Sequence, residues 1–231
     1  MKSSLKNMVV VLFTITAISA LLVGLVQDIT KDAIANANQQ AKNVAKYNVL
    51  GTSQDEAMVV SDTTRLIGDF EITVSTVKRT ADDTIIGYAV EAPSITKSGY
   101  ADRITLMVGF IEENGAAIVN GVEVLSQKET PGLGANMTKA GNSLERSIVG
   151  KDAAGVTFGV TKEGGSFDAL TGSTISSRAY ANAIETAYAG YLWATGRLNT
   201  SEEAVEAAPS GASMTYDNSE PEAQKGEECN E

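Results

Sequence analysis

The sequence contains no histidine and only one cysteine. Without histidine there can be no Ser-His-Asp triad, no histidine general base and no histidine-ligated metal. The single thiol, Cys229, has no second cysteine to pair with, and the chain has no cysteine cluster for an iron–sulfur centre. No Gly-x-Gly-x-x-Gly fingerprint follows a strand-like segment. We therefore predict no catalytic residue, no metal site and no NAD site in this chain.

Positive charge is also scarce: the chain has 18 Lys and Arg and 29 Asp and Glu, which gives a net charge of −11. This balance argues against a nucleic-acid partner, which requires basic patches. The acidic side chains are concentrated at the end, where residues 201–231 hold nine Asp or Glu and one Lys. That segment has few large apolar residues, a composition typical of solvated, disordered chain. We predict an acidic tail over 199–231 and assign it no role.

One long apolar run is present near the start of the chain. Residues 8–26 form 19 consecutive positions without a charge. At about 1.5 Å per residue, this run nearly spans a hydrocarbon core of ~30 Å. Lys2 and Lys6 precede it, so the positive-inside rule keeps residues 1–7 in the cytoplasm and exports the rest. We expect a transmembrane helix over 8–28, in the bacterial inner membrane, with the C-terminal domain on the periplasmic or outer side.

A cleaved signal peptide is the alternative interpretation of this run. Signal peptides have apolar cores of about 7–15 residues followed by small residues. The run here is longer, although "AIANA" at 33–37 resembles a weak cleavage site. The length favours a retained single-pass anchor, and both interpretations export the body.

The body is predicted to be one α+β domain over 52–198, after an alanine-rich helical stalk at 29–50. Strand-like segments lie at 69–79, 84–92, 102–113 and 117–129, with a further candidate in "GVTFGVTK" at 155–162. Asn114-Gly115 predicts a hairpin, and the second Asn-Gly pair, at 120–121, predicts a bulge. A helix is predicted after Ser176, because apolar residues recur there at helical spacing: Ala179, Ala183, Ile184, Tyr188 and Leu192.

Two short motifs stand out in this domain. In "KETPGLGANM", residues 128–137, Pro131 fixes one backbone torsion, while Gly132 and Gly134 permit close approach by a ligand or chain. In "DALTGSTISS", residues 168–177, hydroxyl side chains cluster where a helix begins. Helix starts bind phosphate readily, and a threonine there can hold phosphate by hydrogen bonds or as an ester. The ordinary alternatives are a connecting loop for the first motif and a helix cap at Thr174 or Ser176 for the second.

The second motif resembles a known modification sequence. Asp168, Thr171, Gly172, Ser173 and Thr174 match the flavinylation pattern Asp-x-x-Ser/Thr-Gly-Ala-Thr, apart from serine at the position where alanine is usual. That pattern is typical of FMN-binding domains in the Rnf and Na⁺-pumping NADH:quinone oxidoreductase families. The "ETPGLG" loop, its place after a strand pair and the single anchor resemble the same families. Length and the "TISSRAY" continuation look most like the G subunit of Rnf complexes.

The resemblance implies a covalent FMN, joined by a phosphoester to Thr174. It implies that a separate flavin transferase, using FAD and Mg²⁺, recognises Asp168. The remaining implied cofactor-binding residues lie around the phosphate (Thr171, Gly172, Ser173 and Ser176) and beside the flavin ring (Glu129, Thr130, Gly132 and Leu133).

The implied function is that of a membrane-anchored electron-transfer subunit in an ion-translocating ferredoxin:NAD⁺ oxidoreductase. Its implied partners are the other membrane and peripheral subunits, the flavin transferase and membrane lipid. Two alternatives remain open. One is the equivalent flavin subunit of a Na⁺-translocating quinone reductase; the other is an anchored binding or scaffold module in which Thr174 is only a helix cap.

Overall fold

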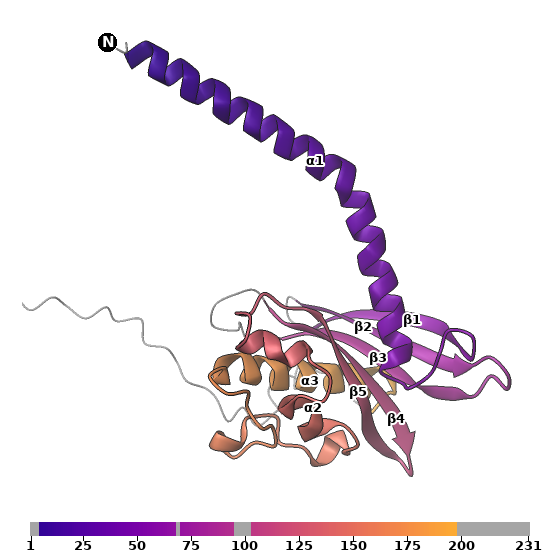
Figure 1. The fold of residues 1–231 in the computed structure, drawn as a ribbon. Helices are drawn as coiled ribbons and strands as arrows, with labels where there is room; N and C mark the ends of the chain where they lie inside the picture. The colour runs from indigo at the N-terminus through magenta and orange to yellow at the C-terminus, as the bar shows by residue number, and fades with distance from the viewer. Residues whose placement is uncertain (1–4, 68–69, 95–102, 198–231) are drawn as a thin grey trace, which may run out of the picture. The chain divides into compact units, whose positions relative to one another are not determined.

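The computed structural model describes residues 5–67, 70–94 and 103–197, all within the first of two units, 1–200 and 201–231 (Figure 1). The predicted acidic tail, with Cys229, lies outside the described residues. The elements, in chain order, are α1 (Leu5–Asn48), β1 (Ala57–Ile67), β2 (Phe70–Arg79), β3 (Ile85–Pro93), β4 (Thr105–Glu113), β5 (Ala116–Ser126), η1 (Gly134–Thr138), α2 (Ser143–Ile148), η2 (Ala153–Gly155), η3 (Thr161–Glu163) and α3 (Thr174–Ala194). An apolar N-terminal helix followed by an antiparallel sheet with helices confirms the predicted α+β class.

Helix α1 is a single helix of 44 residues that includes both the apolar run and the alanine-rich stalk. Its apolar part is long enough to cross a membrane, and its large side chains, such as Leu12 and Phe13, are more than half exposed. Its C-terminal end is different. Ala45 and Val49 are buried against Val77 and other residues on one face of the sheet, so the helix is fixed to the domain there.

The sheet is an antiparallel meander in the order β1-β2-β3-β4-β5. Asn114 and Gly115 both have positive φ, of 52° and 86°, which confirms the predicted hairpin between β4 and β5. Asn120 is an extra residue in β5, because Gly109 pairs with Gly121 while the next residue of β4 pairs with Val119. The predicted bulge is therefore also confirmed.

The bulge serves the docking of α1 on the sheet. The Asn120 side chain donates a hydrogen bond of 2.9 Å to the Val49 carbonyl. A Cβ at Gly109 would lie 2.2 Å from that same carbonyl oxygen, so only glycine permits this approach.

Helix α3 covers the opposite face of the sheet (Figure 1). Alternate residues of the strands point to opposite faces, so Val74 packs with α3 while Val77 packs with α1. The predicted apolar stripe on α3 is confirmed: Ala179, Ala183 and Ile184 are buried, and Tyr188 and Leu192 pack against the same core. This packing fixes the axis of α3, and with it the position of its first residue.

The prediction of a strand at 155–162 is wrong. Residues 153–155 and 161–163 are short 3-10 helices, and only Val160 forms an isolated bridge, to Phe167. Glycines at 155 and 159 interrupt the segment, and a Cβ on Gly165 would lie 2.0 Å from the Gly159 backbone. Strand β1 and helix α2 were not predicted.

Candidate functional site

The residue singled out by the sequence, Thr174, is the first residue of α3. The residue before it, Ser173, occupies the N-cap position, and its side chain makes no capping hydrogen bond. The alternative in which Thr174 or Ser176 caps the helix is therefore contradicted. The cluster of hydroxyl groups at this helix start has to be explained in another way.

The backbone that carries Thr174 is held by a tight turn and by Ser177. The turn is closed by the Ser173 N–H, which donates to the Leu170 carbonyl at 3.1 Å, and Gly172 supplies the positive φ of 72° that it needs. The fully buried Ser177 hydroxyl donates to the Ser173 carbonyl at 2.8 Å and accepts from the Leu170 N–H at 3.0 Å. This bracing role of Ser177 was not predicted, although the residue belongs to the motif.

Several hydrogen-bonding groups are left free where α3 begins. Among the described residues, the N–H groups of Thr174, Ile175 and Ser176 and the half-buried Thr174 hydroxyl have no partner. The Ser173 hydroxyl is buried and also has no partner in the described part of the chain. Free N–H groups at the positive end of a 21-residue helix bind a phosphate group well. The residues at this helix start therefore fit the phosphate end of a nucleotide cofactor.

The first turn of α3 also contacts the "ETPGLG" loop. The Ser176 hydroxyl donates to Glu129 Oε2 at 2.8 Å, and the other oxygen of this buried carboxylate has no partner among the residues that the structure describes. Gly134 lies against this pair, since a Cβ there would be 2.7 Å from Glu129 Oε2 and 2.7 Å from Ser176 Oγ. Two motifs with 30 residues between them thus meet at the start of α3, through residues that are 47 positions apart.

The loop itself presents an apolar side chain beside the second motif. The Leu133 N–H donates to the Thr130 carbonyl at 3.1 Å, and Gly132 between them has a φ of 81°. The side chain of Leu133 is 45% exposed, and its Cδ2 lies 3.3 Å from an ideal Cβ position on Gly172. Leu133 therefore adds an exposed apolar surface beside the second motif.

A hollow of about 620 Å³ opens between the two motifs. Its walls come from the loop and η1, from the start of α2 and from the second motif: Gly132, Leu133, Asn136, Lys139, Ala140, Gly141, Asn142, Ser143, Arg146, Ala169, Leu170 and Thr171. Three of the predicted site residues line it, namely Gly132, Leu133 and Thr171. Lys139 and Arg146 were not predicted as site residues. They lie outside both sequence motifs, and only the fold brings them to the hollow.

Asp168 lies at the edge of this site. Its side chain is exposed, and its backbone N–H donates to the Ser147 hydroxyl of α2 at 2.9 Å. In the next turn of α3, the Arg178 guanidinium is paired with Glu163, and the hydrogen bonds from this guanidinium hold the pKa of the Glu163 carboxyl below its usual value. These contacts tie the start of the motif to α2, and the η3 segment before the motif to α3.

Comparison with known proteins identifies the domain. Residues 99–189 match the family model described as an FMN-binding domain. The G subunit of the ion-translocating oxidoreductase complex of Pseudomonas aeruginosa is 30% identical over 213 residues, 88% of this chain and 96% of the relative. The chain belongs to this G-subunit family. The G subunit of the Na⁺-translocating ferredoxin:NAD⁺ oxidoreductase complex of Acetobacterium woodii is 29% identical over 181 residues, 75% of this chain and 85% of the relative.

These matches confirm the resemblance carried by the two motifs. The protein is an FMN-binding G subunit, a redox subunit of a multi-subunit enzyme. Its apolar α1, together with the membrane complexes of its relatives, makes it a single-pass membrane protein. The matching domain contains both motifs and the whole of the hollow between them.

Proposed function

We propose that this G subunit carries its FMN covalently, through a phosphoester to the Thr174 hydroxyl. The observation that carries the proposal is the free hydroxyl of Thr174 at a helix start whose three leading N–H groups also have no partner among the described residues. A threonine that served only as a cap would use its oxygen to accept one of these N–H groups. Here the oxygen is available to form a bond to phosphorus.

The attachment reaction balances with FAD as the donor, brought by a flavin transferase with Mg²⁺. The Thr174 oxygen forms a bond to the phosphorus of the FMN half, the bond to the AMP half breaks, and the threonine proton leaves. AMP is the second product. The first-turn N–H groups and the Ser173 hydroxyl are placed to receive the non-bridging oxygens, together with Thr171, Gly172 and Ser176. Asp168, the exposed first residue of the motif, is accessible to the transferase.

The loop residues are proposed to receive the flavin ring. Leu133 contributes an exposed apolar surface, Gly132 and Thr130 shape the loop, and Glu129 joins it to α3. When bound, FMN supplies the one- or two-electron chemistry, and the protein holds and orients it. A covalent link prevents an exported protein from losing its cofactor to the surrounding medium.

We place the subunit in a ferredoxin:NAD⁺ oxidoreductase that moves Na⁺ or H⁺, following the name of its Acetobacterium woodii relative. In this proposal α1 lies in membrane lipid and contacts other subunits, while the flavin domain faces the periplasmic or outer side. The lysines before the apolar run support that orientation. An equivalent role in a Na⁺-translocating quinone reductase would be recognised by the membrane subunits that copurify with the protein.

Mass spectrometry of the denatured, full-length protein tests the covalent link. After coexpression with a flavin transferase, the peptide containing Thr174 should gain the mass of one FMN minus water. Thr174→Val should remove this gain, whereas Thr161→Val, which removes an exposed threonine hydroxyl on η3, should leave it. An unmodified wild-type peptide from transferase-competent cells would overturn the proposal.

A further inference from the structure

The hollow beside the FMN attachment point has an unusual charge for this protein. Of the twelve residues that line it, Lys139 and Arg146 are cationic and none is acidic. The whole chain has a net charge of −11, of which residues 201–231 contribute −8. A hollow lined by two cations and no acid points to an anionic occupant.

Neither of the two cations is neutralised within the described part of the chain. No hydrogen bond or ion pair from the side chain of Lys139 or Arg146 occurs among those residues, although both are exposed. Two acids lie close in sequence to the lining residues. The Glu145 carboxylate accepts a 2.6 Å hydrogen bond from the Gly141 N–H, and Asp168 is exposed at the edge of the site.

The backbone that carries the two cations is fixed by one side chain. Asn142 Nδ2 donates to the Lys139 carbonyl at 2.9 Å, and Asn142 Oδ1 accepts from the N–H groups of Leu144 and Glu145 at the start of α2. Arg146 follows in the same short helix. The backbone positions from which the two side chains extend toward the hollow are thus set before any ligand binds.

We propose that Lys139 and Arg146 stabilise the negative charge of the reduced flavin, and so raise its redox potential. This inference rests on the proposed attachment of FMN to Thr174. Oxidised isoalloxazine that takes up two electrons from an external electron carrier and one proton, at N5, keeps one negative charge, on the N1 and C2-carbonyl side of the ring. Thr171, three residues before Thr174, lies on the wall of the hollow. Cations there lower the free energy of the reduced form relative to the neutral oxidised form.

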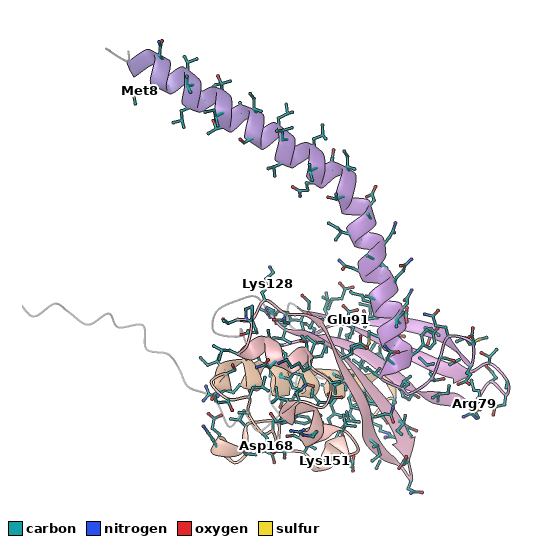
Figure 2. The ribbon with its side chains drawn as sticks, in the orientation of Figure 1. Met8, Arg79, Glu91, Lys128, Lys151 and Asp168 are labelled. Carbon is teal, nitrogen blue, oxygen red and sulfur yellow. The ribbon has the colours of Figure 1, made fainter. Side chains whose placement is uncertain are left out.

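The test is a spectroelectrochemical titration of the full-length protein in detergent, after its flavinylation in cells. Lys139→Gln, Arg146→Gln and the double variant are compared with wild type. Arg79→Gln is the matched control, because it removes one positive charge from the end of β2, away from Asp168 and the site (Figure 2). The mass of the Thr174 peptide is measured first in every sample, so that failure of the covalent link is recognised separately.

At a fixed applied potential, each single variant should lower the ratio of reduced to oxidised flavin by about 3- to 10-fold, and the double variant by the product. A tenfold change corresponds to about 30 mV for a two-electron couple. Added salt should lower the ratio more in wild type than in the double variant. Ratios in both single variants that match Arg79→Gln would overturn the proposal. It would also be overturned if the wild type were flavinylated and neither single variant were, since the cations would then act in attachment.

Discussion

The Ser176 hydroxyl donates a 2.8 Å hydrogen bond to the buried carboxylate of Glu129, and this bond joins the "ETPGLG" loop to the first turn of α3. Since the other Glu129 oxygen has no partner, Ser176 is the only hydrogen-bond donor to this carboxylate among the described residues. The contact unites the proposed ring-binding loop with the proposed attachment site.

Ser176→Ala should therefore destabilise the domain more than an ordinary hydroxyl deletion. The substitution leaves a buried carboxylate without a donor, which costs about 1–3 kcal/mol. Chemical denaturation of the full chain measures this, with Ser126→Ala, at the exposed end of β5, as the control. The fraction of Thr174 peptide that carries FMN should fall in parallel. Equal stability of the two variants would show that the bond contributes nothing.

Gly134→Ala tests the same junction by crowding it. The added methyl group would lie 2.7 Å from both Glu129 Oε2 and Ser176 Oγ and 2.9 Å from Glu129 Cβ. We expect a loss of about 1–3 kcal/mol in the free energy of unfolding, together with less flavinylation. Gly155→Ala is the matched control, because open space surrounds that position and its φ is not positive. Thermal melts of the two variants should differ clearly in midpoint.

The sequence was sufficient for features that depend on neighbours in the chain. The Asn114-Gly115 hairpin, the bulge at Asn120 and the apolar stripe of α3 each follow from a local rule about turns or spacing. The position of Thr174 at a helix start was predictable for the same reason.

Features that depend on distant neighbours were not predictable. Glu129 and Ser176 are 47 positions apart, and no local pattern shows that they meet. The cationic hollow combines η1, α2 and the second motif in the same way.

Strand β1 was missed because its centre, "SDTT", is polar and exposed, as an edge strand can be. The apolar alternation in "GVTFGVTK" wrongly predicted a strand, because the glycines of this segment and the close backbone contact at Gly159 prevent one from forming.

Acid should weaken the link between η3 and α3. Hydrogen bonds from Arg178 lower the pKa of Glu163, outweighing its slight desolvation, so this pair stabilises the fold at pH values above the unfolded pKa of Glu163. That stability is lost as the pH falls through the lower folded pKa. Thermal melts from pH 3 to 7 should show wild type above Glu163→Gln at neutral pH and equal to it in acid. The difference will be small because both side chains are partly exposed. A constant difference at all pH values would contradict the prediction.

Glu185, on α3, should change the stability of the fold with pH in the opposite direction. Burial raises the pKa of its carboxyl, and the hydrogen bond from Asn182 at 3.3 Å only partly offsets this effect. A group with a raised folded pKa binds its proton more tightly in the folded state, so stability falls as the pH rises from the unfolded pKa through the folded one. Glu185→Gln should therefore be more stable than wild type at about pH 7, with the advantage disappearing below about pH 4.

Melting curves of Glu163→Gln and Glu185→Gln over one pH series thus provide mutual controls, since the two differences from wild type must have opposite signs at neutral pH. A Glu185→Gln chain that melts below wild type at neutral pH would mean that the carboxylate has a favourable partner in the folded state.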